Sequence, residues 1–107
     1  MQCAQVIDSL AAVQYWIRNV ARHSKSFWLP TATDKFYPDF VALLNDGRLL
    51  VVEYKGAHIA EGSDTNEKRT VGALWERKSN GKGLFVVAEK MVDGKDVRQQ
   101  LVEKIGI

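Results

Sequence analysis

The sequence is poor in the residues that form disulfides, soft-metal sites and membrane spans. Its 107 residues include one cysteine and two histidines, which excludes an internal disulfide and leaves no zinc-ligand spacing. A bound metal would therefore be held mainly by oxygen. No apolar run approaches the length needed to cross a bilayer, and the start, MQCAQVIDSLAAVQYW, has no basic lead followed by an uninterrupted apolar core. We expect no membrane partner and a cytoplasmic location.

The remaining composition is that of one ordinary globular domain. Hydrophobic residues make up 46% of the chain and charged residues 26%, which is typical of a packed core beneath a polar surface. The net charge of +2 permits contact with nucleic acid but does not by itself indicate it. The local placement of charge therefore matters more than the total.

The first half of the chain predicts a helix followed by strands. Apolar residues at alternating steps of four and three predict a helix from about Gln5 to Arg22. The segment SFWLPTATDKFYPDFVALL mixes aromatic and β-branched residues with two prolines. It predicts two strands separated near Thr31 to Lys35, with the prolines at strand ends or bends. The residues of the helical stripe are Val6, Leu10, Val13, Ile17 and Val20.

The second half predicts two helices and one strand. Asp64 followed by Glu67 is typical of a capping box and predicts a helix that ends before Gly81. GLFVVAEK predicts a strand, and GKDVRQQLVEKIGI predicts a short amphipathic helix. The predicted order is helix, three strands, helix, strand, helix. The residues predicted to lie on one side of the first of these helices are Lys68, Val71, Leu74, Trp75 and Lys78. The residues of the last helix that are predicted to point inward are Val97, Leu101 and Ile105.

The segment NDG, residues 45–47, links two apolar runs and is typical of a hairpin. Phe40–Leu44 and Leu49–Lys55 are therefore predicted to be antiparallel neighbours. A two-residue loop would pair Phe40 with Glu53, whereas a three-residue loop would pair Asp39 with Glu53. A slip of one residue moves every side chain to the other face, so only the second register brings the two carboxylates together. We predict the three-residue loop, with its glycine left-handed.

In that register three charged side chains meet at one end of the hairpin. Glu53 and Lys55 alternate along one strand and so share a face, and Asp39 lies across from Glu53. Two carboxylates at close range need a cation. Lys55 supplies one, as in a structural salt-bridge cluster, and a divalent metal would supply a stronger one. Hard oxygen ligands favour Mg²⁺, with Mn²⁺ as a possible substitute. Such a set suits phosphodiester hydrolysis. Lys55 could orient or deprotonate the attacking water, or stabilise the charged transition state.

These residues resemble a known family. PD at Pro38-Asp39 stands fourteen residues before EYK at residues 53–55, within the strand VVEYKG, and this pattern resembles the PD-(D/E)XK nuclease superfamily. The resemblance implies a restriction-endonuclease-like αβββαβ core, an α/β (α+β) fold with a mixed four-stranded sheet flanked by helices. It also implies that Asp39 and Glu53 bind the divalent metal, that the backbone carbonyl of Tyr54 adds a ligand, and that Lys55 is the catalytic lysine.

A narrower resemblance covers most of the chain, from about Tyr15 to Glu89. FWLPTATDKFYPDFVALLNDGRLLVVEYKG followed by DTNEKRTVGALWERKSNGKGLFVV is similar to the C-terminal nuclease region of type III restriction enzyme cleavage subunits and related helicase-like proteins. The resemblance implies DNA as substrate, an ATP-dependent motor or helicase domain, and a modification or recognition subunit as partners. Residues 1–107 would then be a single nuclease-like domain, part of or excised from a larger protein. Because GKG at residues 81–83 is too short for a GxxxxGK[ST] loop, we expect no ATP site in this chain.

Other residues allow more than one interpretation. Lys68 and Arg69 are candidates for substrate or phosphate contact, although a lysine at the rim of the core is the simpler interpretation of Lys68. Asp8 is an uncertain match to an additional acidic residue on the first helix, and His58 is most simply a loop residue. The three tryptophans are more simply core residues than base-stacking platforms. A catalytically silent nucleic-acid-binding or assembly module is the alternative function, and RNA or a nucleotide is the alternative substrate.

Overall fold

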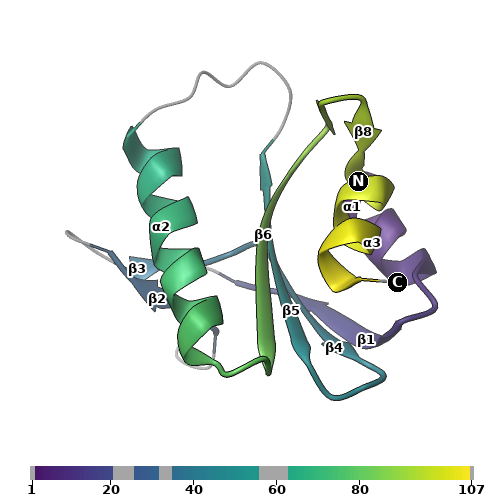
Figure 1. The fold of residues 1–107 in the computed structure, drawn as a ribbon, viewed down its shortest axis with the longest axis horizontal. Coiled ribbons are helices and arrows are strands. Elements are labelled where there is room, and N and C mark those ends of the chain that lie inside the picture. The colour runs from purple at the N-terminus through teal and green to yellow at the C-terminus, as the bar shows by residue number, and fades with distance from the viewer. Residues whose placement is uncertain (1, 21–25, 32–34, 56–62, 107) are drawn as a thin grey trace.

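A four-stranded sheet lies between helices on both of its faces (Figure 1). The computed structural model describes residues 2–20, 26–31, 35–55 and 63–106. The sheet has the order β1-β4-β5-β6. β1, β4 and β5 are antiparallel neighbours, and β6 runs parallel to β5. The predicted mixed α/β architecture is confirmed. The strands are Val13–Arg18 (β1), Phe40–Leu44 (β4), Leu49–Lys55 (β5) and Gly83–Glu89 (β6).

Three helices, within the described ranges, form one helical layer on each face of the sheet. α1 (Gln2–Ser9) and α3 (Val97–Ile105) cover one face of the sheet, and α2 (Ser63–Lys78) covers the other. On the α1 and α3 face, Ile7 and Leu101 pack with Leu50 of β5. On the α2 face, Val51 and Phe85 pack with side chains of α2. No helix in the described ranges is both long and apolar enough to cross a membrane.

The predicted first helix, from about Gln5 to Arg22, is wrong. α1 ends at Ser9, and the next apolar residues form strand β1 instead. The turn between them is closed by hydrogen bonds from Leu10 N–H to the Ile7 carbonyl (3.2 Å) and from Val13 N–H to the Leu10 carbonyl (3.1 Å). β-branched and aromatic side chains in VQYWIR favour a strand, and pairing with β4 stabilises this segment as a strand. Ile17, from the predicted inner stripe, is 54% exposed.

The strands predicted between Ser26 and Leu44 are also assigned differently. β2 (Leu29–Pro30) and β3 (Lys35–Phe36) pair only with each other, as a small separate sheet. The first strand of the central sheet is therefore β1, from inside the predicted helix. The prolines lie where a missing N–H is tolerated. One is in the short β2, and Pro38 is buried two residues before the start of β4.

The hairpin of β4 and β5 has the predicted register. Phe40 pairs with Val52, and Leu43 pairs with Leu49. The turn is closed by hydrogen bonds from Leu44 N–H to the Arg48 carbonyl (2.8 Å) and from Gly47 N–H to the Leu44 carbonyl (3.0 Å). Gly47 has φ +92°, a conformation that glycine adopts without steric cost. The three-residue loop is confirmed, and the same register places Asp39 opposite Glu53.

The C-terminal elements largely follow the sequence pattern. α2 ends before Gly81 as predicted, and the side chain of Asp64 lies outside the described residues. Leu74 is 43% exposed, so the predicted shared side of α2 is wrong at this residue. A short unpredicted hairpin of β7 (Met91–Val92) and β8 (Lys95–Asp96) precedes α3. A capping box between Asp96 and Gln99 begins α3 (Val97–Ile105). The residues of α3 that were predicted to point inward, Val97, Leu101 and Ile105, are buried.

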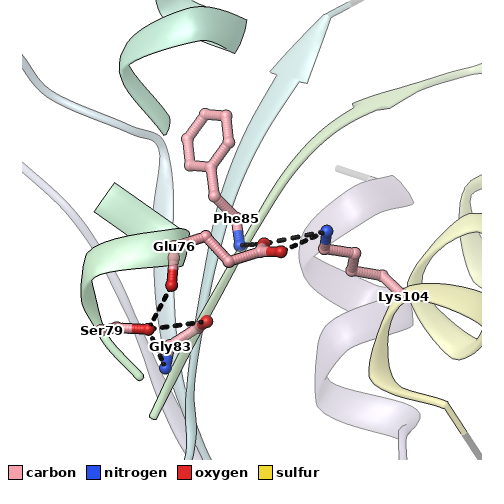
Figure 2. Close-up of polar contacts among 5 residues, drawn as sticks. All are labelled: Glu76, Ser79, Gly83, Phe85 and Lys104. Carbon is pink, nitrogen blue, oxygen red and sulfur yellow. Dashed lines mark hydrogen bonds and ion pairs between the residues drawn. The ribbon is translucent and has the colours of Figure 1, made fainter. Parts of the chain in front are cut away.

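Side chains from both helix layers cover the outer edge of β6 (Figure 2). Glu76 Oε1 accepts a hydrogen bond from Phe85 N–H (2.7 Å), and Ser79 Oγ accepts one from Gly83 N–H (3.0 Å). Lys104 Nζ lies 2.9 Å from Glu76 Oε1, which joins α3 to α2 around the edge of the sheet. These side chains satisfy backbone groups that would otherwise pair with another strand.

Candidate active site

Asp39 lies where β4 begins, and its carboxylate binds the backbone of β5. Asp39 Oδ2 accepts a hydrogen bond from Tyr54 N–H at 2.8 Å. Every second residue of β5 turns its N–H and C=O toward β4, and in this register the residue opposite Tyr54 is Pro38. Proline has no N–H to offer the Tyr54 carbonyl. The Pro38-Asp39 sequence therefore ends the ladder and puts a carboxylate beside the backbone of Tyr54.

β5 carries the other two predicted site residues toward the α2 layer. Glu53 alternates with Val51, a core residue beneath α2, and Lys55 follows on the same face. The Glu53 side chain is 14% exposed, and Lys55 is buried. Lys68 Nζ of α2 lies 3.0 Å from Glu53 Oε2. Two buried or nearly buried charges thus stand two residues apart on one strand.

The environment of Glu53 disfavours its ionised form. Burial, and then the negative charge of Asp39, raise the pKa of Glu53, Lys68 partly opposes both, and the result is a pKa of about 7. A smaller cause is a hydrogen bond between the Glu53 and Asp39 carboxyl groups, which needs a proton on one of them. When Glu53 is ionised, its Oε1 atom is buried and has no hydrogen-bond donor among the described residues. Such an oxygen is expected to gain a cation or a proton.

Lys68 and Arg69, the predicted substrate-contacting residues, both lie on the side of α2 that faces the strand ends. Besides its ion pair with Glu53, Lys68 places its ammonium group 5.1 Å from the centre of the Phe36 ring. Arg69 Nη2 lies 3.3 Å from Glu89 Oε2. The parallel register pairs Glu89 of β6 with Lys55 of β5. Glu53 and Glu89, each paired with a basic side chain of α2, are therefore the acidic neighbours of Lys55 on this face.

Asp8, a further candidate from the sequence, is not brought to this cluster. Asp8 accepts a hydrogen bond from Trp16 Nε1 at 3.0 Å, on a helix that covers the opposite face of the sheet. His58 lies outside the described residues. Glu89 is a neighbour of the cluster that was not predicted. The effect of the Asp39 charge on Cys3, which lies on the same helix as Asp8, was not predicted either. Burial, and then the charge of Asp39, raise the pKa of the Cys3 thiol to about 11. The acidic end of the strand GLFVVAE was the only sequence signal for Glu89.

The donor set consists of hard oxygen atoms. Asp39 and Glu53 supply carboxylates, and the Tyr54 carbonyl points to the same side of β5 as its Asp39-bound N–H. No group of three or more His, Cys, Asp or Glu side chains gathers at one point within the described ranges. Oxygen donors of this kind suit Mg²⁺ or Mn²⁺, and the buried Oε1 of Glu53 is the atom that such a cation would satisfy.

Comparison with family models, curated proteins and solved structures gives no match for this chain.

Proposed function

We propose that this chain is a metal-dependent nuclease domain that hydrolyses DNA phosphodiester bonds. The observation that carries the proposal is the junction of β4 and β5. The hairpin register and the Asp39–Tyr54 hydrogen bond (2.8 Å) hold one carboxylate beside a second, buried carboxylate whose Oε1 has no donor among the described residues. Lys55 follows two residues later on the same face. A purely structural charge cluster has no need for an unsatisfied buried oxygen.

Asp39, Glu53 and the Tyr54 carbonyl would hold the cation. When bound, Mg²⁺ would polarise the scissile phosphate and make a nearby water more acidic. Asp39 is already fixed by the Tyr54 N–H, so its free carboxylate oxygen keeps one orientation. Glu53 would give up either its proton or its contact with Lys68 as the cation arrives. In the metal-bound state, Glu53 would thus be compensated by the cation in place of the proton or Lys68.

The lysines would act on the phosphate. Lys55 lies between Glu53 and Glu89, where its ammonium group can donate to the attacking water or to a non-bridging phosphate oxygen. Negative charge grows on those oxygens in the transition state, and a fixed ammonium group stabilises it. Lys68, once separated from Glu53, would reach the same phosphate from α2. Arg69 would contact the neighbouring phosphate through the groove that it lines with Phe85 and Val87.

The order of the elements is compatible with this function. Without the two small hairpins, the chain runs α1, β1, β4, β5, α2, β6, α3, and its first six elements have the αβββαβ order of a restriction-endonuclease-like core. We propose that the chain has this restriction-endonuclease-like fold. We also propose that its DNA target is chosen by two partners, namely an ATP-dependent motor or helicase and a modification or recognition subunit. Fold alone does not establish an activity, so the proposal depends on the site.

The test is cleavage of supercoiled plasmid DNA by the purified chain in Mg²⁺ or Mn²⁺, compared with EDTA. We expect nicking that is lost in Asp39→Asn and Lys55→Met. Glu103→Gln is the matched control because Glu103 is an exposed carboxylate, paired with Lys95 at 2.6 Å, on the opposite layer. Nicking that persists in Asp39→Asn, or that falls equally in the control, would contradict the proposal.

A catalytically silent binding module is the second candidate, and the Glu53–Lys68 ion pair (3.0 Å) favours it. That pair already compensates one carboxylate oxygen without a metal. A silent module would bind DNA with strong salt dependence but would not gain thermal stability from Ca²⁺. A metal site would raise the melting temperature of the wild-type chain in Ca²⁺ and leave that of Asp39→Asn unchanged.

A further inference from the structure

An exposed tryptophan and a lysine form a pair on the outer side of the β2–β3 hairpin. Leu29 and Phe36 point inward and are buried, so strand alternation turns Trp28 and Lys35 outward. Trp28 is 43% exposed, and Lys35 Nζ lies 4.6 Å from the centre of its ring. The pair of Trp28 and Lys35 therefore presents an aromatic face and a positive charge together on the surface.

This pair is tied to the site by two routes. Asn19 receives a hydrogen bond from Phe27 N–H at its Oδ1 (3.0 Å) and donates one from Nδ2 to the Phe27 carbonyl (2.7 Å). The N–H of the same asparagine donates to the Asp39 carbonyl at 2.8 Å. On the other strand, Phe36 lies beneath the ammonium group of Lys68 at 5.1 Å. The residues next to Trp28 and Lys35 thus contact groups of the active site.

Trp28 differs from the other two tryptophans, which have structural roles. Trp16 donates to Asp8 (3.0 Å) and packs edge-to-face on Phe40 at 5.8 Å. Trp75 packs so closely over Gly83 that an added Cβ there would collide with its ring. Packing thus accounts for these two rings, whereas it leaves much of the Trp28 ring in solvent. The expectation that all three tryptophans are core residues is wrong for Trp28.

We propose that Trp28 and Lys35 bind an unpaired nucleotide of the nucleic-acid substrate, which rests on the nuclease function proposed above. The base would stack on the Trp28 ring, and Lys35 would neutralise the adjoining phosphate. Aromatic stacking tolerates any base but needs an exposed base face, which a paired duplex does not offer. The substrate class is therefore DNA with a single-stranded segment, such as an end, a gap or a strand opened by a motor. The charge of Lys35 complements the phosphate backbone.

The experiment measures binding without cleavage. Tryptophan fluorescence is titrated with oligo(dT) of about 12 nucleotides, a length that spans one binding groove, and with a duplex of equal length, both in EDTA at low salt. Stacking should quench the wild-type emission. Trp28→Ala should weaken single-strand binding about tenfold, read by anisotropy of a labelled oligonucleotide, while Trp28→Phe keeps most of the affinity. Lys35→Gln should lower the slope of log affinity against log salt by about one.

Met91→Ala is the matched control because Met91 is an exposed apolar residue (60%) on the β7–β8 hairpin. It should bind like the wild type, and all variants should show wild-type melting curves. Equal single-strand binding by Trp28→Ala and wild type, or an equal loss for the duplex, would overturn the inference while metal-dependent nicking stood. A wild-type chain that neither binds DNA nor nicks it would overturn the proposed function as well.

Discussion

Replacement of Glu53 by glutamine should stabilise the folded chain at neutral pH, although it removes a site carboxylate. Burial, and then the charge of Asp39, raise the pKa of Glu53 from 4.5 to about 7. A carboxyl whose pKa is higher in the folded state binds its proton more tightly there than in the unfolded state. Its contribution to stability is therefore greatest below pH 4.5, falls as the pH rises to about 7, and stays low above that.

The size of this effect follows from the same two values. The gap between 4.5 and about 7 corresponds to at most about 3 kcal/mol of lost unfolding free energy. Glutamine resembles the protonated acid in shape and carries no charge, so Glu53→Gln should recover most of this loss above neutral pH. Below about pH 4.5 the variant and the wild type should be nearly equal in stability. Sites adapted to binding often lower stability in this way.

The assay is urea unfolding of both proteins in EDTA at about pH 4.5, 6 and 8. The difference between variant and wild type isolates Glu53, because the other titrating groups are common to both. We expect that difference to grow by about 2–3 kcal/mol across the range. Addition of Ca²⁺ at the highest pH should shrink it by stabilising the wild type. A difference that does not change with pH would refute the description of Glu53 as a buried, destabilised carboxylate.

Two further predictions concern the support of the site. An alanine at Gly72 would drive its Cβ into the ring of Phe85, so that either α2 or this ring must shift. Gly72→Ala should lower the unfolding free energy by about 1–2 kcal/mol in urea despite a gain of about 1 kcal/mol in helix propensity, and an unchanged or higher midpoint would contradict this packing. Asp39→Asn should lower the pKa of Glu53, because the charge of Asp39 is the second cause of its elevation. Carbon-detected NMR titration of the Glu53 carboxyl measures this, and an unchanged pKa would show that the two groups do not interact.

The part of the site that was predictable from sequence depends on local rules. The NDG turn limits the hairpin to two registers, and alternation along β5 fixes which side chains share a face. The sequence alone was therefore sufficient to place Asp39, Glu53 and Lys55 together. The helix α3 was predictable for a similar reason, because its cap and its apolar spacing lie within a few residues of one another.

The rest depends on contacts between distant segments. The apolar stripe from Val6 to Val20 also fits a short helix followed by a strand, and only pairing of β1 with β4, interrupted by an irregularity between Val13 and Tyr15, decides between the two. The Lys68–Glu53 ion pair requires α2 to approach the sheet through Gly72. Glu89 reaches Lys55 only through the parallel register of β5 and β6. No local pattern specifies these distances.

The two borders of the central sheet differ in their capacity to accept another strand. At β6, side chains of Glu76, Ser79 and Gln100 occupy backbone groups that a new strand would need. At β1, alternation turns the N–H and C=O groups of Trp16 and Arg18 away from β4. Enlargement of this sheet, by a fused domain or an assembled subunit, would therefore proceed from β1. Such an addition would leave the Lys68–Glu53 contact undisturbed, because α2 packs over β5 and β6.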